Sequence, residues 1–315
     1  MYVVYIPVLR AVLPCSRENI TFLEAPLTFN NGKDWLPSLC FFMAYQNQSK
    51  RVRVMGVINT TPDSFSDGGR FDTTESAFRH AQQLIDDGAD ILDVGGESTR
   101  PGSRKVDLSE EIERTVPLIK AIREISDISI SIDTNKPGVM QQAVEAGANL
   151  INSIWALRLE NSLEIAAELG VSVCLMHMQG TPETMQKNPS YTDVVTEVMD
   201  FLQQRIEAAI KAGVKQSNII IDPGFGFGKT LQHNLLLLKS LPEFKSLGVP
   251  LLVGMSRKSM IGTILDKPVD QRLYGSISSA VIAAMMGADI IRVHDVSETV
   301  DAIAMVNALN ETVPG

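Results

Sequence analysis

The chain has 315 residues, of which 44% are hydrophobic and 21% charged, and its formal net charge is −9. A chain of this length can bury a substantial core, and α/β barrels of roughly 250 residues fold as one domain. The acidic balance argues against a nucleic-acid binder, so any bound anion must be held by a local group of donors. The three cysteines are far apart and contain no C-x₂-C pair, which indicates neither a disulfide framework nor a thiolate zinc site.

Residues 1–50 lack clear periodicity. They are expected to be an N-terminal extension: a short hairpin, a partly disordered segment, or an artefact of the start site. Residues 1–14 are apolar, but no basic region precedes them and no small-residue cleavage site is obvious. The apolar run Trp35–Tyr45 is interrupted by Pro37 and is shorter than the about 20 residues that span a bilayer. We therefore expect a soluble, cytoplasmic protein that binds no membrane.

From Arg51 onward, short apolar runs alternate with longer amphipathic stretches. Nearly continuous apolar runs are typical of parallel strands that are covered on both faces. The predicted strands are Val52–Ile58, Asp90–Val94, Ile128–Ile132, Leu150–Ile151, Val171–Met176, Ile219–Ile221, Leu251–Val253 and Ile290–Val293. The stretches between them have helical spacing, and several end at a glycine directly before the next strand, as at Gly88, Gly147 and Gly287.

Eight strand–helix units are compatible with a closed barrel or an open doubly wound sheet. Eight units in about 265 residues favour the barrel. The predicted fold is therefore a single-domain α/β protein, a (β/α)₈ barrel of the TIM type over residues 51–315, preceded by the extension.

Polar side chains collect after the predicted strands, where a barrel of this kind holds its ligands. One group carries donors suited to phosphate oxygens: Ser98, Thr99, Arg100, Arg292 and His294. Either arginine alone is more simply explained by a surface ion pair. Two arginines at strand ends, one of them beside a histidine, favour an anion site.

A second group at the same rim consists of Asp133, Asn152 and Asp222. A carboxylate accepts two parallel N–H bonds from a 2-amino-4-oxo heterocycle as it does from a guanidinium. Helix N-capping is the alternative for each of these side chains. Lys258, after the seventh predicted strand, adds a donor for a ring carbonyl or nitrogen.

Two nucleotide-binding motifs are only partly matched by the sequence. The glycine-rich run Gly224–Thr230 looks like a phosphate-binding G-x-x-x-x-G-K-[ST] loop, but the first glycine would fall at Pro223. The dinucleotide fingerprint fails too, because its last glycine would be Lys229. His177, next to a strand end, is expected to be structural rather than a base.

Two long segments, Met55–Gly69 and Asp93–Gly102, resemble the signatures of the dihydropteroate synthases. Five shorter segments follow in the family's order: Ile132–Thr134, Met176–Pro182, Asp222–Lys229, Ser256–Ser259 and Arg292–Asp295. The chain departs from the family after Asn152, where Ser153–Leu157 replaces the usual aspartate and glycine-containing turn. The fourth loop therefore has no predicted role.

The resemblance implies a set of binding residues. The pterin would be held by Asp133, Asn152, Met176, Asp222, Lys258 and Arg292, the diphosphate by Asn59, Thr99, Arg292 and His294, and p-aminobenzoate by Thr99, Arg100, Phe227 and Ser256. Lys258, Arg292 and His294 would be catalytic, and Asn59 would also touch a magnesium ion. The implied protein is a homodimeric transferase of folate biosynthesis and a sulfonamide target.

The implied reaction joins 6-hydroxymethyl-7,8-dihydropterin diphosphate to p-aminobenzoate. The reacting carbon is allylic to the pterin, and the aromatic amine is neutral at pH 7, so no activating base is needed. Catalysis then requires positioning and charge stabilisation of the leaving group, for which magnesium is suited.

Three alternatives stay open. A pterin-binding barrel of the corrinoid methyltransferase kind would share Asp133 and Asp222 but lack the loops Thr60–Gly69 and Glu97–Gly102. A non-catalytic pterin- or folate-binding scaffold would not need Lys258, Arg292 and His294, which are all present. A generic phosphate-binding isomerase barrel is the third.

Overall fold

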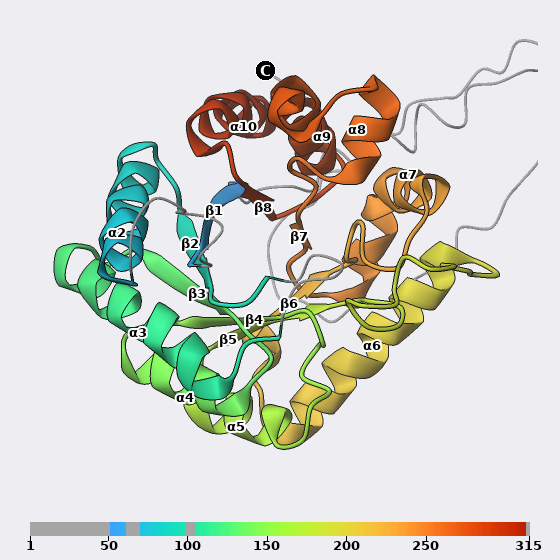
Figure 1. Ribbon diagram of the computed structural model, residues 1–315. Helices are drawn as coiled ribbons and strands as arrows, with labels where there is room; N and C mark the ends of the chain where they lie inside the picture. Colours follow the sequence, from blue (N-terminus) through green and yellow to red (C-terminus); the bar gives the residue numbers. More distant parts are fainter. Residues whose placement is uncertain (1–50, 61–69, 99–104, 313–315) are drawn as a thin grey trace, which may run out of the picture. The chain divides into compact units, whose positions relative to one another are not determined.

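A computed structural model describes residues 51–60, 70–98 and 105–312, with the side chains of 70–73 left out. The predicted N-terminal extension, most of the first loop, and both Thr99 and Arg100 lie outside this range. Within it, eight strands alternate with helices that surround them (Figure 1). The predicted (β/α)₈ barrel is confirmed.

The elements follow one another in the expected order. The strands are β1 (Arg53–Asn59), β2 (Ile91–Gly95), β3 (Ser129–Asp133), β4 (Leu150–Ser153), β5 (Ser172–Met176), β6 (Ile219–Asp222), β7 (Leu252–Val253) and β8 (Ile290–Val293). The α-helices are α2 (Arg70–Asp86), α3 (Leu108–Ile125), α4 (Pro137–Glu145), α5 (Ser162–Leu169), α6 (Val194–Ala212), α7 (Leu231–Lys239), α8 (Ser259–Leu265), α9 (Leu273–Met285) and α10 (Val296–Glu311). Short 3₁₀ helices cover η2 (Gln216–Asn218), η3 (Leu241–Leu247) and η4 (Val269–Gln271).

The strands form one parallel sheet in the order β6-β5-β4-β3-β2-β1-β8-β7. A parallel bridge between Ile221 and Leu251 links β6 to the start of β7, which brings the two ends of the sheet together. The Ile221 amide also donates to the Pro250 carbonyl at 3.0 Å. The carboxyl ends of all eight strands therefore meet at one rim.

The predicted strands begin and end within two residues of the observed ones. The bounds agree because glycines that end the helices mark where the following strands start. Gly88, Gly147 and Gly287 have φ of 89°, 117° and 106°, the left-handed region that ends a helix and returns the chain to the sheet.

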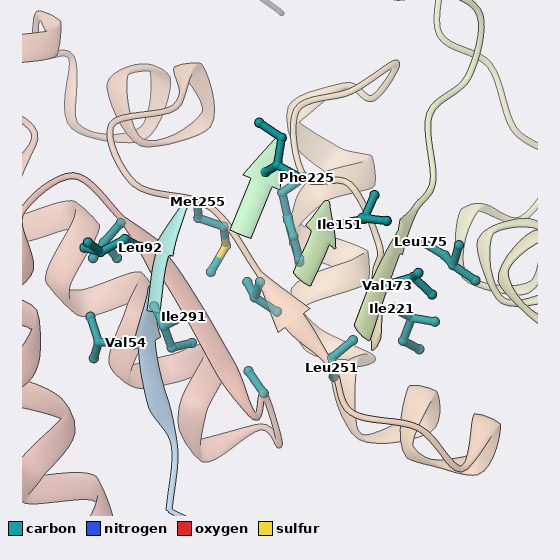
Figure 2. Close-up of a cluster of buried hydrophobic side chains, with 14 of the residues drawn as sticks. Val54, Leu92, Ile151, Val173, Leu175, Ile221, Phe225, Leu251, Met255 and Ile291 are labelled. Carbon is teal, nitrogen blue, oxygen red and sulfur yellow. The ribbon is translucent and has the colours of Figure 1, made fainter. Parts of the chain in front are cut away.

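Two clusters of buried apolar side chains build the barrel itself. The larger cluster lies between strands and helices, and Figure 2 shows part of it, including Val54, Leu92 and Ile291. The smaller cluster comes from alternate strand positions that face the barrel interior: Met55, Ile91, Leu150, Cys174, Ile220, Leu252 and Ile290. The barrel is thus closed by packed side chains below the rim. No helix within the described residues has both the length and the apolarity to cross a membrane.

Helix α3 offers a matched test of this packing. Ile122 is fully buried against the sheet, whereas Ile125, one turn later, is 50% exposed. Ile122→Ala should lower the free energy of unfolding by about 2–5 kcal/mol, because the removed side-chain atoms leave a cavity in the core. Ile125→Ala should cost less than about 1 kcal/mol. Urea unfolding followed by circular dichroism measures both, and equal losses would contradict the packing described.

Candidate functional site

The candidate site lies directly above the apolar interior layer. Side chains two positions apart on a strand share a face. The residue two positions after an interior apolar residue therefore also points into the barrel. Four interior residues are followed in this way by a polar one: Ile91 by Asp93, Leu150 by Asn152, Ile220 by Asp222, and Ile290 by Arg292. The strand register therefore builds a polar layer at the mouth of the barrel.

Arg292 lies at the centre of this layer. Its Nε is 2.6 Å from Oδ2 of Asp93, and its second guanidinium nitrogen is 3.0 Å from Oδ2 of Asp133. The Asn152 amide donates to the same Asp93 oxygen at 3.2 Å. Burial alone would lower the pKa of Arg292, but Asp93 and then Asp133 outweigh it and raise that pKa. The guanidinium thus stays charged and joins strands β2, β3 and β8.

The remaining charges of the layer are strongly perturbed. Burial, reinforced by the charge of Asp93, raises the pKa of Asp133 to about 7, although Arg292 opposes the shift. Burial also raises the pKa of Asp222, against the attraction of Lys258. Burial lowers the pKa of Lys258 to about 8, although Asp222 counteracts it. Three carboxylates and two cations thus share a small, poorly hydrated space, an arrangement typical of functional sites.

An apolar wall stands beside the charges. Phe227, in the loop after β6, packs with Trp155 against a cluster formed by Ile154, Met176, Met178 and Met185. The Nζ of Lys258 donates to the Phe225 carbonyl at 2.5 Å and lies 4.8 Å from the centroid of the Phe227 ring. The unusual fourth loop thus contributes Ile154 and Trp155 to this wall, a role that the sequence did not predict.

Ser256 and His294 form a pair at the ends of β7 and β8. The Ser256 hydroxyl accepts from the backbone amide of His294 at 3.2 Å and lies 3.1 Å from its Nδ1. An ion pair between Arg257 and Asp295 joins the same two loops one residue further along. These contacts fix the orientation of the imidazole next to Arg292.

Asn59 ends β1 and is paired in register with Gly95, which is in turn paired with Asp133. Because Gly95 has no side chain, the Asn59 and Asp133 side chains face each other across it: a Cβ built there would lie 3.9 Å from Oδ1 of Asn59 and 4.0 Å from Oδ2 of Asp133. In the described part of the chain, no three His, Cys, Asp or Glu side chains form a metal-binding group.

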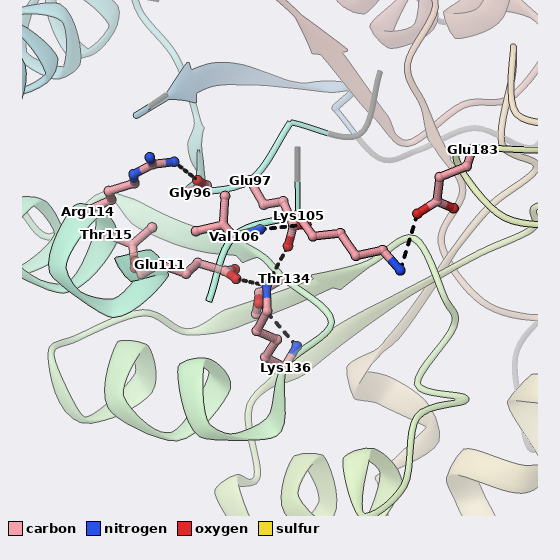
Figure 3. A network of polar contacts seen from close by, with 10 residues as sticks. All are labelled: Gly96, Glu97, Lys105, Val106, Glu111, Arg114, Thr115, Thr134, Lys136 and Glu183. Atoms are coloured by element: carbon pink, nitrogen blue, oxygen red, sulfur yellow. Dashed lines mark hydrogen bonds and ion pairs between the residues drawn. The ribbon is translucent and has the colours of Figure 1, made fainter. Parts of the chain in front are cut away.

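The loop after β2 is anchored at both ends (Figure 3). Lys136 forms ion pairs with Glu97 and with the buried Glu111 of α3. Glu97 also accepts from the Val106 amide at 3.3 Å, and Arg114 donates to the Gly96 carbonyl at 3.0 Å. Thr99 and Arg100, predicted site residues between these anchors, lie outside the described residues.

The structure brings the other predicted residues to one rim. Asp133, Arg292, Asp222 and Lys258 interact electrostatically with one another, and Asn152 joins them through Asp93. Asp93, which has no role among the predicted site residues, is fully buried and makes the shortest contact of Arg292. A lone carboxylate inside the apolar run Ile91–Val94 was the available signal.

Buried charges beside an apolar wall, at the rim of a TIM barrel, are typical of an enzyme active site; the two together are called the cup below. The model of a family described as pterin binding enzymes matches residues 55–294. A dihydropteroate synthase of Escherichia coli strain K12 is 52% identical over 255 residues, which cover 81% of this chain and 90% of that protein.

Solved structures of dihydropteroate synthases have the same fold as this chain. The dihydropteroate synthase of Yersinia pestis in a sulfonamide complex superposes with a TM-score of 0.80 at 50% identity, covering 83% of this chain and 95% of that one. The enzyme of Xanthomonas albilineans with 4-aminobenzoic acid gives 0.79 at 47% identity, covering 84% and 94%. The chain belongs to the dihydropteroate synthase family of pterin-binding enzymes.

The raised pKa of Asp133 has a consequence for stability. Between the unperturbed value of 3.8 and about 7, the folded chain keeps a proton that the unfolded chain loses. The free energy of unfolding therefore contains a contribution from Asp133 that is fully present below pH 3.8 and is lost as the pH rises to about 7.

Asp133→Asn removes this titration. As the pH rises from 5 to 8, the wild type should lose on the order of 2 kcal/mol of unfolding free energy that the variant does not lose. Urea unfolding of both proteins at the two pH values measures the difference. A gap that does not change with pH would show that Asp133 titrates near its ordinary pKa.

Proposed function

We propose that this chain joins 6-hydroxymethyl-7,8-dihydropterin diphosphate to p-aminobenzoate, with release of diphosphate and 7,8-dihydropteroate. The observation that carries the proposal is the convergence of Asp133, Asp222, Lys258 and Arg292 in one buried cup. The match to the pterin-binding family covers residues 55–294, a range that includes all four of them. We further propose that residues 51–315 form the catalytic domain, that residues 1–50 are an extension, and that the enzyme is cytoplasmic.

The pterin would bind in the carboxylate-rich half of the cup. Asp133 and Asp222 would accept the N–H groups of its amino-substituted edge, and Lys258 would donate to a ring carbonyl or nitrogen. The Asn152 side chain would complete this edge, Met176 would pack beside the ring and Arg292 would stack on it. Such binding satisfies polar groups whose burial is otherwise costly.

The diphosphate would lie toward Arg292, His294 and Asn59, with Thr99 as a further contact. In the reaction, the aromatic amine forms the new C–N bond as the C–O bond breaks, and the bonding pair leaves with the diphosphate. The amine then loses a proton. Cationic donors that are already positioned stabilise the charge that develops on the leaving group. The side-chain amide of Asn59 would hold a magnesium ion, which would supply further positive charge next to the leaving group.

The p-aminobenzoate would pack against Phe227 and reach Ser256, with Thr99 and Arg100 closing the pocket. An aromatic wall next to the pterin cup brings the two partners together, which lowers the entropic cost of their encounter. One relative was crystallised with 4-aminobenzoic acid and another with a sulfonamide drug. We infer that sulfonamides compete for the same pocket here.

The proposal predicts incorporation of labelled p-aminobenzoate into a pterin product, dependent on magnesium and abolished by a chelator. Asp222→Asn places an amide N–H toward the donors of the ring and should lower kcat/KM at least about tenfold. Asp127→Asn, a matched change at an exposed aspartate, should leave kcat/KM unchanged. Folded wild-type protein that gives no product would remove the proposed function.

We also propose a homodimer, through exposed apolar side chains of α9 and of α10. Tyr274, Ile282 and Met285 lie on one side of α9, and Tyr274 is 75% exposed. On the adjacent α10, Met305 is 73% and Leu309 is 49% exposed. Large exposed apolar side chains on neighbouring helices are typical of an interface, and a two-fold dimer would cover the same residues on both chains.

The dimer is tested by light scattering after gel filtration. The wild type should have twice the 34.4 kDa mass of the chain. Tyr274→Glu combined with Met305→Glu should reduce the mass to that of one chain, because a charge would be buried without a partner. Ile125→Glu, on the exposed side of α3, is the control and should remain dimeric. A monomeric wild type would contradict the proposed interface.

A further inference from the structure

The glycine-rich loop Gly224–Lys229 after β6 is shaped by side chains rather than by regular secondary structure. Gly224, Gly226 and Gly228 have φ of 71°, 81° and 64°, so the backbone alternates in direction. The carbonyls of five successive residues each accept a side-chain hydrogen bond: Gly224 from Lys229 at 2.9 Å, Phe225 from Lys258 at 2.5 Å, Gly226 from Gln186, Phe227 from Lys229 at 3.0 Å, and Gly228 from Tyr191 at 2.7 Å.

Lys229 binds the inner side of this loop. Besides the carbonyls of Gly224 and Phe227, its Nζ contacts Nδ1 of His177 at 2.9 Å, so three acceptors surround an ammonium that has three N–H groups. Burial, with the charge of Lys229, lowers the pKa of His177 to about 2, which leaves Nδ1 free to accept. The structural role expected for His177 agrees with this geometry.

Gln186 and Tyr191 bind the outer side, and both come from the loop after β5. They donate to Gly226 and Gly228, the two neighbours of Phe227 in the chain. The two loops also touch closely: a Cβ on Gly224 would lie 1.9 Å from the His177 carbonyl oxygen, and one on Gly228 would lie 2.7 Å from that of Gln179. The position of Phe227 is therefore set by the loop after β5.

We propose that Gln186 and Tyr191 are positioning residues for the second substrate. They hold the carbonyls on either side of Phe227, and they thereby fix its ring against p-aminobenzoate. This inference rests on the proposed function, which assigns p-aminobenzoate to the wall formed by Phe227. The pterin end of the loop is held separately, by the Gly224 amide, which donates to Asp222 at 2.7 Å.

Separate KM values for the two substrates test the proposal in the full-length enzyme. Tyr191→Phe and Gln186→Ala each remove one donor, and each should raise KM for p-aminobenzoate about fivefold. In both variants, KM for the dihydropterin diphosphate and kcat should stay within about twofold of wild type, because Asp222 and the charged cup are untouched. Lys187→Ala, at the exposed residue next to Gln186, is the matched control and should change neither KM.

Lys229→Met keeps the volume of the side chain but removes all three donors. Because Lys229 contacts Gly224 as well as Phe227, both KM values should rise at least about tenfold and the thermal midpoint should fall. The proposal therefore does not depend on this variant, since the Gln186 and Tyr191 changes lie nearer the surface and leave the core intact.

The outcomes are distinguishable. A selective rise in KM for p-aminobenzoate in the Gln186 and Tyr191 variants supports the proposal. Equal rises for both substrates, or no change in either, would overturn it while the proposed function stands, provided that the wild type forms product. Absence of product from the wild type would instead overturn the proposed function.

Discussion

The interaction on which the site depends is the contact of one guanidinium with two buried carboxylates. Arg292 reaches Asp93 at 2.6 Å and Asp133 at 3.0 Å, and these residues lie on β8, β2 and β3. A buried carboxylate without a partner would cost several kcal/mol. The barrel therefore has to place all three strands in one register, and β1, paired in parallel with both β2 and β8, provides that register.

The same crowding keeps the cup receptive to a ligand. Asp93, Asp133 and Asp222 are crowded around the cations Arg292 and Lys258, and Asp222 also interacts with Lys229. Burial removes water from both Asp133 and Lys258, which raises the pKa of the first and lowers the pKa of the second. A ring that brings several N–H donors would replace missing water, and binding would relieve a cost already present in the folded protein.

Much of this could be predicted from the sequence, because the signals are local. Apolar runs between glycine-terminated helices located the strands, and in a barrel every strand end points to the same rim. The contact between Asp93 and Arg292 could not be predicted, because the sequence around a buried acid does not indicate a partner some 200 positions away in the chain. Gln186, Tyr191 and Trp155 lie in irregular loops, where no periodicity relates a residue to its contacts.

The glycine-rich loop shows why a motif has to be judged by where its polar groups are directed. In a phosphate-binding loop, successive backbone N–H groups point at the anion. Here the amides of Gly224, Gly226 and Phe227 are already bonded to Asp222, Asn234 and the Gly224 carbonyl. The lysine that would contact phosphate in such a loop is instead buried against His177. Glycine and lysine thus serve a different purpose: they allow close contact with the loop after β5 and hold an aromatic side chain at the edge of the cup.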